Sequence, residues 1–133
     1  MNALLLDTNG VSILFNRRHP LWEQAVHLVV DHQLAISFMS RAELLLWPVL
    51  NDWGASRRAS LHQHLELHTT LYADDAMCTE WVGIVAQCRS VGRPIQTADA
   101  WIAACARRWD LPLVTADVRD FEAVAGLQLL PLK

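Results

Sequence analysis

Four carboxylates in this 133-residue chain stand where apolar, strand-like runs end or where helix-like segments begin. They are Asp7 in LLLDTN, Glu43 in SRAELLL, Asp99 in TADAWIAA and Asp117 in LVTADVRDF. In a parallel α/β sheet, strand ends and the starts of the following helices meet along one edge, where ligands bind. Four carboxylates gathered there would repel one another and could not all stay ionised alone. A divalent cation removes this repulsion, so the spacing predicts a metal-dependent active site.

Helical geometry strengthens the case for Glu43 and Asp99. The residues three, four and seven positions after each of them are apolar, so each acid heads the apolar stripe of its own helix. An ionised carboxylate that faces the core is costly unless it is paired or binds a metal. Asp7 and Asp117 follow apolar strands directly and therefore lie at carboxyl ends. We expect all four side chains to point to one place.

Most of these acids also have a purely structural interpretation. Ser40 and Glu43 have the spacing of a capping box. Asp99 would favour the dipole at its helix N-terminus, and Asp117 could be a turn residue. Asp7 resists such an interpretation, because its strand ends in Asp-Thr-Asn and places three polar side chains at the sheet edge. Four such acids at one edge favour the catalytic interpretation.

Short apolar runs alternate along the chain with segments of helical periodicity. We expect strands at 3–6, 34–38, 69–72, 112–115 and 127–130, and helices at 9–16, 19–32, 40–49, 55–68, 74–90 and 98–109. This alternation predicts an α/β fold: a three-layer α/β/α sandwich with a mostly parallel central sheet. Because 53% of the residues are hydrophobic and 19% charged, we expect one domain, residues 1–133, with a substantial core.

The sequence also indicates the cellular compartment. No apolar run reaches the length of a membrane span, and MNALLLDTNG does not have the pattern of a signal peptide. Cys78, Cys88 and Cys105 fall within helical patterns without a CxxC motif, which is typical of buried thiols in a reducing compartment. We therefore expect a cytoplasmic protein with no membrane partner.

The formal net charge of −3 argues against a general nucleic-acid coat protein. However, ten of the eleven basic residues are arginines, whose forked side chains suit phosphate recognition. Paired arginines are most simply explained as solvated helix faces, but Arg17, Arg18 and Arg93 could form a phosphate-binding rim. Among the six tryptophans, Trp22, Trp47 and Trp53 could mark an interaction surface.

These segments resemble the PIN-domain ribonucleases, and most closely the VapC-type toxins of bacterial toxin–antitoxin modules. The resemblance covers nearly the whole chain, through LLLDTN, the Glu43 that follows a strand and a serine, GRPIQTADAWIAACA, and LVTADVRDF followed by AGLQLLP. It makes Asp7, Glu43, Asp99 and Asp117 the expected acidic quartet. Asp120 is a rival or partner to Asp117, since such proteins can use the Asp of the DF pair. The chain departs from the pattern at Gly10, where a larger apolar residue is more usual.

The resemblance implies metal-assisted hydrolysis of an RNA phosphodiester bond. All-carboxylate ligation suits Mg²⁺, with Mn²⁺ as a possible substitute. Asp7 and Asp99 would hold the principal ion, while Glu43 and Asp117 would orient water or help bind a second ion. The resemblance also implies a cognate antitoxin protein and a homodimer.

Two further side chains would support this chemistry. Asn9 and Thr115 could donate hydrogen bonds to water or to the phosphate. A separate metal site is conceivable at His64 and His68, which have i,i+4 spacing, but with His62 they form a polar run without HExxH, and a solvated helix face is the favoured interpretation.

Other functions remain open at this level. A housekeeping PIN-type RNA-processing nuclease shares every motif named above, and a non-catalytic binding module of the same fold is disfavoured by the intact quartet. A phosphorylated receiver domain is disfavoured because the only lysine is Lys133. A haloacid-dehalogenase-like phosphatase would need an acid where Asn9 stands.

Overall fold

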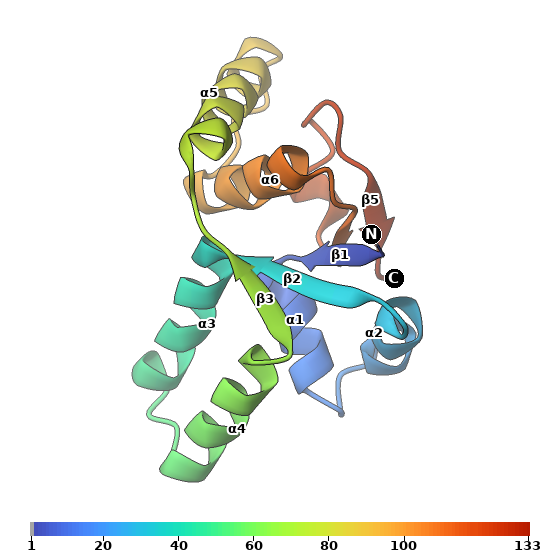
Figure 1. Cartoon of the computed structure of the whole chain (residues 1–133), viewed down its shortest axis with the longest axis vertical. Coiled ribbons are helices and arrows are strands. Elements are labelled where there is room, and N and C mark those ends of the chain that lie inside the picture. The colour runs from blue at the N-terminus through green and yellow to red at the C-terminus, as the bar shows by residue number, and fades with distance from the viewer. Residues whose placement is uncertain (1) are drawn as a thin grey trace.

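The structure is a computed structural model that describes residues 2–133. Figure 1 shows strands alternating with helices along the chain. The strands are β1 (Ala3–Leu6), β2 (Gln33–Ser37), β3 (His68–Leu71), β4 (Leu113–Thr115) and β5 (Leu129–Pro131). The helices are α1 (Thr8–Phe15), α2 (Trp22–Val29), α3 (Phe38–Leu50), α4 (Ala55–Leu65), α5 (Asp75–Ser90) and α6 (Thr97–Trp109), with a 3-10 turn η1 (Val118–Asp120).

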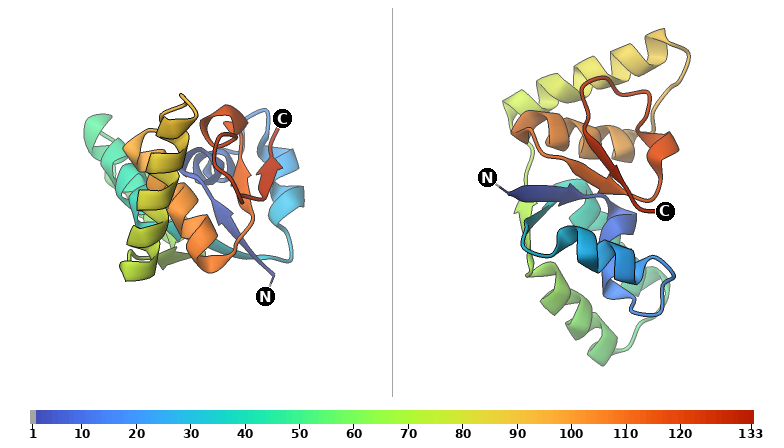
Figure 2. Two further views of the ribbon diagram at one scale, coloured as in Figure 1. Left: turned by 90° about the horizontal axis from the view of Figure 1, so that it is seen from above. Right: turned by 90° about the vertical axis from the view of Figure 1, so that its right-hand side faces the viewer.

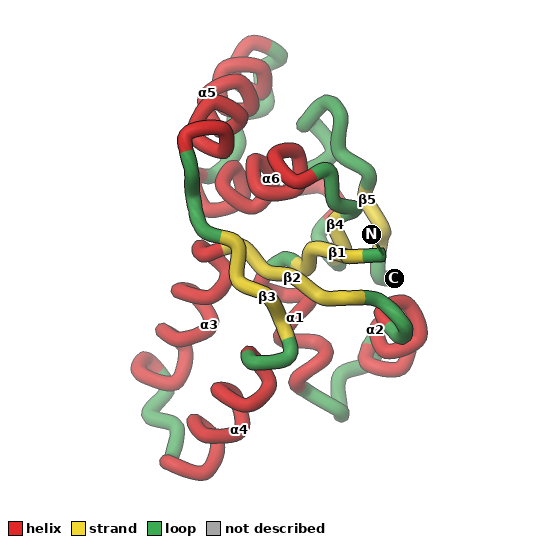
Figure 3. The backbone as a smooth tube through the Cα atoms, in the orientation of Figure 1, coloured by secondary structure: helices red, strands yellow, loops and turns green. Residues whose placement is uncertain are grey.

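Within residues 2–133, the five strands form one sheet in the order β3-β2-β1-β4-β5, and each neighbouring pair is parallel. The strands form one continuous layer in the tube view of Figure 3. From β1 the chain moves outward to β2 and β3, then crosses back to β4 on the other side of β1. The strand order therefore reverses between β1 and β4, which is the position at which parallel α/β sheets bind ligands.

Helices cover both faces of the sheet, with α1 to α4 on one side and α5 and α6 on the other (Figures 1 and 2). Strand residues alternate between the two faces. Leu4 and Leu6 pack in the core beneath α1 to α4, whereas Leu5 packs in the core beneath α5 and α6. The predicted three-layer α/β/α architecture is confirmed, and the sheet is entirely parallel rather than mostly so.

The start of α3 differs from the prediction. Ser37, not Ser40, caps this helix, and its hydroxyl accepts a hydrogen bond from the Ser40 amide at 3.1 Å. Ser40 lies inside the helix and is fully buried. The capping-box interpretation of Ser40 and Glu43 is therefore wrong, and the Glu43 side chain is not needed at the helix N-terminus.

The histidine segment also differs. Helix α4 ends at Leu65, so His68 belongs to β3, where it is buried. The rings of His64 and His68 pack with centroids 5.3 Å apart, and a solvated helix face is the wrong interpretation for both. Burial lowers the pKa of His64 and lowers that of His68 to about 4. Burial therefore favours the neutral form of both rings, which belong to the packing between α4 and β3.

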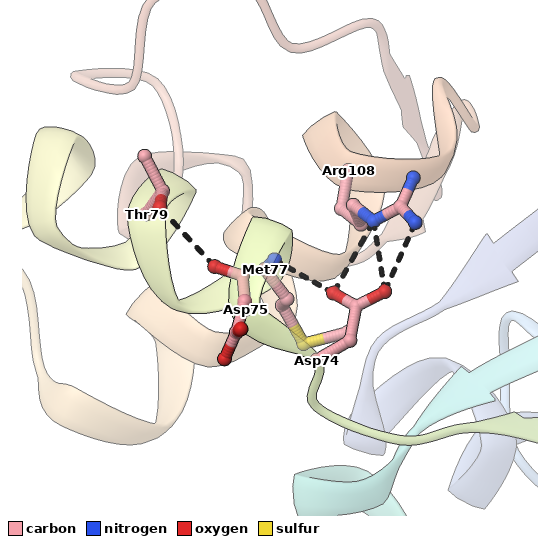
Figure 4. A network of polar contacts seen from close by, with 5 residues as sticks. All are labelled: Asp74, Asp75, Met77, Thr79 and Arg108. Carbon is pink, nitrogen blue, oxygen red and sulfur yellow. Dashed lines mark hydrogen bonds and ion pairs between the residues drawn. The ribbon is translucent and has the colours of Figure 1, made fainter.

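An ion pair joins α5 and α6, the two helices on one face of the sheet (Figure 4). Asp74 caps α5 by accepting from the Met77 amide at 2.8 Å, and Arg108 of α6 donates to both of its carboxylate oxygens at 2.9 to 3.2 Å. The hydrogen bonds from Arg108 hold the pKa of Asp74 below its usual value. The neighbouring Arg107 pairs with Glu80 at 2.8 Å. This arginine pair thus holds α5 against α6 instead of forming a solvated face.

Two remaining expectations concern cysteines and membranes. Cys88 and Cys105 are buried free thiols, but Cys78 is exposed. In residues 2–133, no helix combines the length and the apolar character needed to cross a membrane.

Candidate active site

A polar pocket of about 120 Å³ lies at the carboxyl edge of the sheet, where the strand order reverses. The ends of β1 and β4 and the starts of α1, α3 and α6 converge there. Its lining includes all five acids singled out by the sequence, together with two polar and two apolar side chains: Asp7, Glu43, Asp99, Asp117, Asp120, Thr8, Asn9, Trp47 and Ile102. In the described part of the chain, no arginine, lysine or histidine lines this pocket.

Asp7 is the most constrained of these acids. It follows β1 directly and is only 4% exposed. Its Oδ1 accepts from the Gly10 amide at 2.7 Å and so caps α1, while its Oδ2 accepts from the Thr115 hydroxyl at 2.6 Å. Burial raises the pKa of Asp7 to about 6 despite these hydrogen bonds, with a smaller contribution from the charges of Asp117 and Asp120.

Gly10 is explained by this close packing. A Cβ at this position would lie 3.0 Å from Asp7 Oδ1 and 3.4 Å from the Val114 carbonyl oxygen. The first contact is tighter than an ordinary van der Waals contact, and the second is at the lower limit of that range. The glycine lets the first turn of α1 approach the Asp7 carboxylate and the β4 backbone together, so the departure from the family pattern suits the local geometry.

Glu43 is held by a residue from a different element. The Thr8 hydroxyl donates to Glu43 Oε1 at 2.6 Å, across 35 positions of sequence. Thr8 Oγ1 also lies 3.0 Å from the buried Ser40 hydroxyl. Because a hydroxyl has one proton to donate, Ser40 donates in turn to Thr8. This chain of hydroxyls fixes one oxygen of Glu43 and leaves Oε2 without a hydrogen-bond partner among residues 2–133.

A second network joins the start of α1 to the segment after β4. The Asn9 amide donates to Asp117 Oδ2 at 2.6 Å, and the Asp117 backbone N–H donates to Thr115 Oγ1 at 2.9 Å. Thr115 is fully buried, so its hydroxyl links Asp7 to the backbone of Asp117. Asn9 lines the acidic pocket, but its amide donates to Asp117. Thr115 does not line the pocket, and because its buried hydroxyl donates to Asp7, a contact with the phosphate is the wrong interpretation for it.

Asp99 and Asp120 complete the acidic cluster. Asp99 is half-buried in the first turn of α6 and, within residues 2–133, its carboxylate accepts no hydrogen bond. Burial raises the pKa of Asp99 to about 6, and the next largest cause is the charge of Asp120. Asp120 is exposed at the end of η1 and lines the same pocket as Asp117. The structure therefore brings both rivals for the fourth acidic position together.

The donor chemistry of this pocket fits a hard divalent cation. Burial is the main cause that raises the pKa of two of its acids, Asp7 and Asp99, to about 6, and the charges of neighbouring carboxylates add to it. A bound cation would favour their ionised forms. As they stand, no three acidic, histidine or cysteine side chains in residues 2–133 are grouped closely enough to enclose an ion. Mg²⁺ does not require such a cage, because it keeps several waters and uses one or two carboxylates.

A much larger cleft of about 810 Å³ adjoins the acidic pocket at Trp47, which lines both. Its walls combine aromatic and apolar residues with arginines: Phe15, Leu44, Trp47, Trp53, Leu61, Arg17, Arg18 and Arg57. The Arg57 guanidinium stacks 3.6 Å from the centre of the Trp53 ring. Of the three tryptophans proposed as surface markers, Trp47 and Trp53 line this cleft, whereas Trp22 is half-buried and donates to the Leu14 carbonyl.

Comparison with known proteins decides the family. The family model of the PIN domain matches residues 4–127. The chain belongs to the PIN-domain family. The resemblance seen in its sequence motifs is therefore confirmed.

Individual relatives span nearly the same length as this PIN domain. It is 29% identical to Ribonuclease VapC1 of Haemophilus influenzae strain R2866, over 93% of each chain. It is 34% identical to Plasmid stability protein StbB of Pseudomonas syringae pv. tomato, over 96% of each chain. Among solved structures, VapBC-1 from nontypeable Haemophilus influenzae superposes with a TM-score of 0.81 and 25% identity, covering 97% of both chains.

Sequence reasoning missed two features of this PIN domain's site. Thr8, the partner of Glu43, was part of the Asp-Thr-Asn run but received no role. Arg119 lies between Asp117 and Asp120 and lines a neighbouring recess. The signal for both was their position beside a predicted acid at a strand end.

Proposed function

We propose that this PIN domain, residues 1–133, is a Mg²⁺-dependent endoribonuclease and the toxin of a toxin–antitoxin module. The observation that carries the proposal is the convergence of five carboxylates on one pocket that, in residues 2–133, has no basic lining residue. The similarity to Ribonuclease VapC1 over 93% of both chains supports the same reaction class. Cytoplasmic location follows from the proposal, because RNA is the substrate.

Asp7 and Asp99 are the proposed metal ligands, since burial raises the pKa of both and a bound cation would favour their ionised forms. Mg²⁺, when bound, would neutralise charge that develops on the phosphate and lower the pKa of the attacking water. Asp7 cannot swing away, because the Gly10 amide and the Thr115 hydroxyl hold its two oxygens. Mn²⁺ is expected to substitute, as it also prefers oxygen ligands.

Glu43 and Asp117 are proposed to orient the water that attacks the phosphodiester bond. Each has one oxygen held, by Thr8 and by Asn9 respectively, and one oxygen left to accept a hydrogen bond. Fixing a carboxylate in advance removes the need to reorganise it during the reaction, which is a main source of catalytic rate. Asn9 itself donates to Asp117, so its role is to position that carboxylate.

The antitoxin is proposed to bind the large cleft. An apolar floor with an arginine rim suits an amphipathic segment that carries acidic residues. Because Trp47 lines both the cleft and the acidic pocket, a segment in the cleft would lie beside the catalytic carboxylates. A homodimer remains a prediction from the family resemblance.

Cleavage of a mixed set of structured RNAs, including tRNAs, tests the enzymatic part. Wild-type protein with Mg²⁺ or Mn²⁺ is compared with EDTA-treated protein, with Asp7→Asn and with Asp31→Asn. Asp31 is an exposed acid whose positive φ of 67° asparagine also tolerates, so it is the matched control. Cutting by wild type and Asp31→Asn alone supports the proposal. Cutting that survives both EDTA and Asp7→Asn contradicts it.

Induced expression in a bacterial host tests the toxin part. We expect wild type to arrest growth, Asp7→Asn to be harmless, and co-expression of the small gene beside this one to restore growth. An active nuclease that neither arrests growth nor has such a neighbour would instead be a housekeeping RNA-processing enzyme of the same fold.

A further inference from the structure

A second recess, of about 190 Å³, opens directly beside the acidic pocket. Asp99 and Asp120 line both cavities, so the two cavities share part of one wall. Unlike the acidic pocket, this recess has two arginines, Arg93 and Arg119, among its lining residues. The two arginines thus lie on one side of the site, next to the acids that make the pocket negative.

Arg119 is placed by the same short element as two of the acids. The 3-10 turn η1 holds it between Asp117 and Asp120, and its side chain is exposed. It takes part in none of the ion pairs or side-chain hydrogen bonds found in residues 2–133. Arg107 and Arg108 are by contrast fully engaged between α5 and α6. Arg119 is therefore available to a ligand without breaking an internal contact.

Arg93 is nearly as available. It pairs with Glu122 at 2.9 Å, but both side chains are about half exposed, at 51% and 43%. Exposed ion pairs of this kind contribute little to stability, so a stronger anion can displace Glu122 at low cost. The recess therefore offers one free and one exchangeable guanidinium group to an anion.

An RNA substrate meets a physical difficulty at this site. The chain carries a formal net charge of −3, and five carboxylates surround the pocket where the scissile phosphate would react. A metal ion offsets charge only at the reacting phosphate, so the phosphates on either side still face the acids. Guanidinium groups bind phosphate through paired, charge-assisted hydrogen bonds.

We infer that the recess formed by Arg93 and Arg119 binds a backbone phosphate of RNA next to the scissile one. This inference rests on the proposed nuclease function. Arg119 supplies the primary contact and Arg93 a second one, in competition with Glu122. The contacts are to the backbone, so they position the strand and do not read its sequence.

The test combines cleavage kinetics with RNA binding for three variants and a control. Arg119→Ala removes the primary contact, Arg119→Lys keeps the charge but loses the fork, and Glu122→Gln releases Arg93 from its ion pair. Arg89→Ala is the matched control, because Arg89 is exposed on α5 and lines a recess that shares no residue with the acidic pocket. Thermal melting of each variant verifies that it is folded.

Kinetics use the RNA that wild type cuts best in the mixed set, with Mg²⁺ present. We expect Arg119→Ala to raise KM about tenfold with kcat nearly unchanged, and Arg119→Lys to recover part of this loss. Glu122→Gln should lower KM about twofold, a gain that misfolding cannot produce. Arg89→Ala should match wild type.

Binding uses a short fluorescently labelled single-stranded RNA in EDTA, at several salt concentrations. For Arg119→Ala, the slope of log affinity against log salt should become shallower by about 0.7, the value for one phosphate contact on a single strand. Arg119→Ala with the KM and salt slope of Arg89→Ala would overturn the inference, and this is also the result expected if the recess serves a protein partner.

The two proposals can fail separately. A wild type that cuts RNA with a silent Arg119→Ala keeps the nuclease and removes the phosphate subsite. A wild type that cuts no RNA but shows the Arg119-dependent salt slope keeps the subsite and removes the nuclease. If wild type neither cuts nor binds RNA, both are wrong.

Discussion

Replacing Asp7 by asparagine should make the metal-free protein more stable, although both carboxylate oxygens of Asp7 accept hydrogen bonds from the protein. The carboxylate is only 4% exposed, and burial raises its pKa from 3.8 to about 6. A pKa rise of roughly two units means that ionisation of Asp7 lowers the free energy of unfolding by about 3 kcal/mol. Asparagine removes the charge and keeps an Oδ1 acceptor for the Gly10 amide. It loses charge-assisted bonds, so we expect a net gain in the free energy of unfolding of about 1–2 kcal/mol.

The effect of Asp7→Asn on stability depends on pH in a defined way. The pKa is about 6 in the folded chain and 3.8 in the unfolded chain, so the folded state binds more protons between these values. The stability contributed by protonated Asp7 is complete below the unfolded pKa and is lost as pH rises through the folded pKa. The advantage of Asp7→Asn should therefore be full at about pH 7.5 and absent near pH 4.

Urea denaturation followed by tryptophan fluorescence measures this difference, with Asp31→Asn as the control. In EDTA at about pH 7.5, Asp7→Asn should unfold at higher urea than wild type, and added Mg²⁺ should stabilise wild type more than the variant. The reasoning fails if Asp7→Asn is less stable than wild type in EDTA. It also fails if the difference in stability between Asp7→Asn and wild type is the same at about pH 7.5 and about pH 4. A lost hydrogen bond alone would produce that result.

The remaining predictions concern the same cluster. Thr115→Val removes the hydroxyl that links the Asp7 carboxylate to the Asp117 backbone, and should lower the free energy of unfolding by about 1–3 kcal/mol in urea titrations. Asp120→Asn removes the largest charge acting on Asp99, so an NMR titration should find the pKa of Asp99 lowered from about 6 towards 3.8; an unchanged value would exclude that coupling. Calorimetry should show protons released when Mg²⁺ binds at about pH 6 but none at about pH 8, since Asp7 and Asp99 are fully ionised there.

Much of the fold was predictable from the sequence because short apolar runs and helical periodicity are both local signals. The apolar run of β1 and the apolar stripe after Asp99 each locate an acid at one edge of a parallel sheet, and the structure brings Asp7 and Asp99 to one pocket. The helix-start error at Ser40 arose because two serines three positions apart competed for one cap. The sequence alone did not show that Ser37 would take it.

The parts that could not be predicted depend on contacts between distant residues. The Thr8 and Glu43 side chains meet across 35 positions, and Asn9 and Asp117 meet across 108. No local pattern encodes such distances, so the sequence identified the acids but not the side chains that aim them. The same holds for His68, whose burial depends on β3 pairing with β2 rather than on helical spacing.

The energetics of the pocket are themselves an argument for function. A fold selected only for stability would not retain a buried Asp7 and a half-buried Asp99 whose pKa values are both raised to about 6. Apolar or amide side chains in their place would remove that repulsion. The surrounding hydroxyl and amide donors do not neutralise the acids, because they carry no charge. They fix the direction of three carboxylates while Asp99 stays free of internal bonds in the described chain. Such an arrangement sacrifices stability in the metal-free protein, and we expect the proposed cation to restore it on binding.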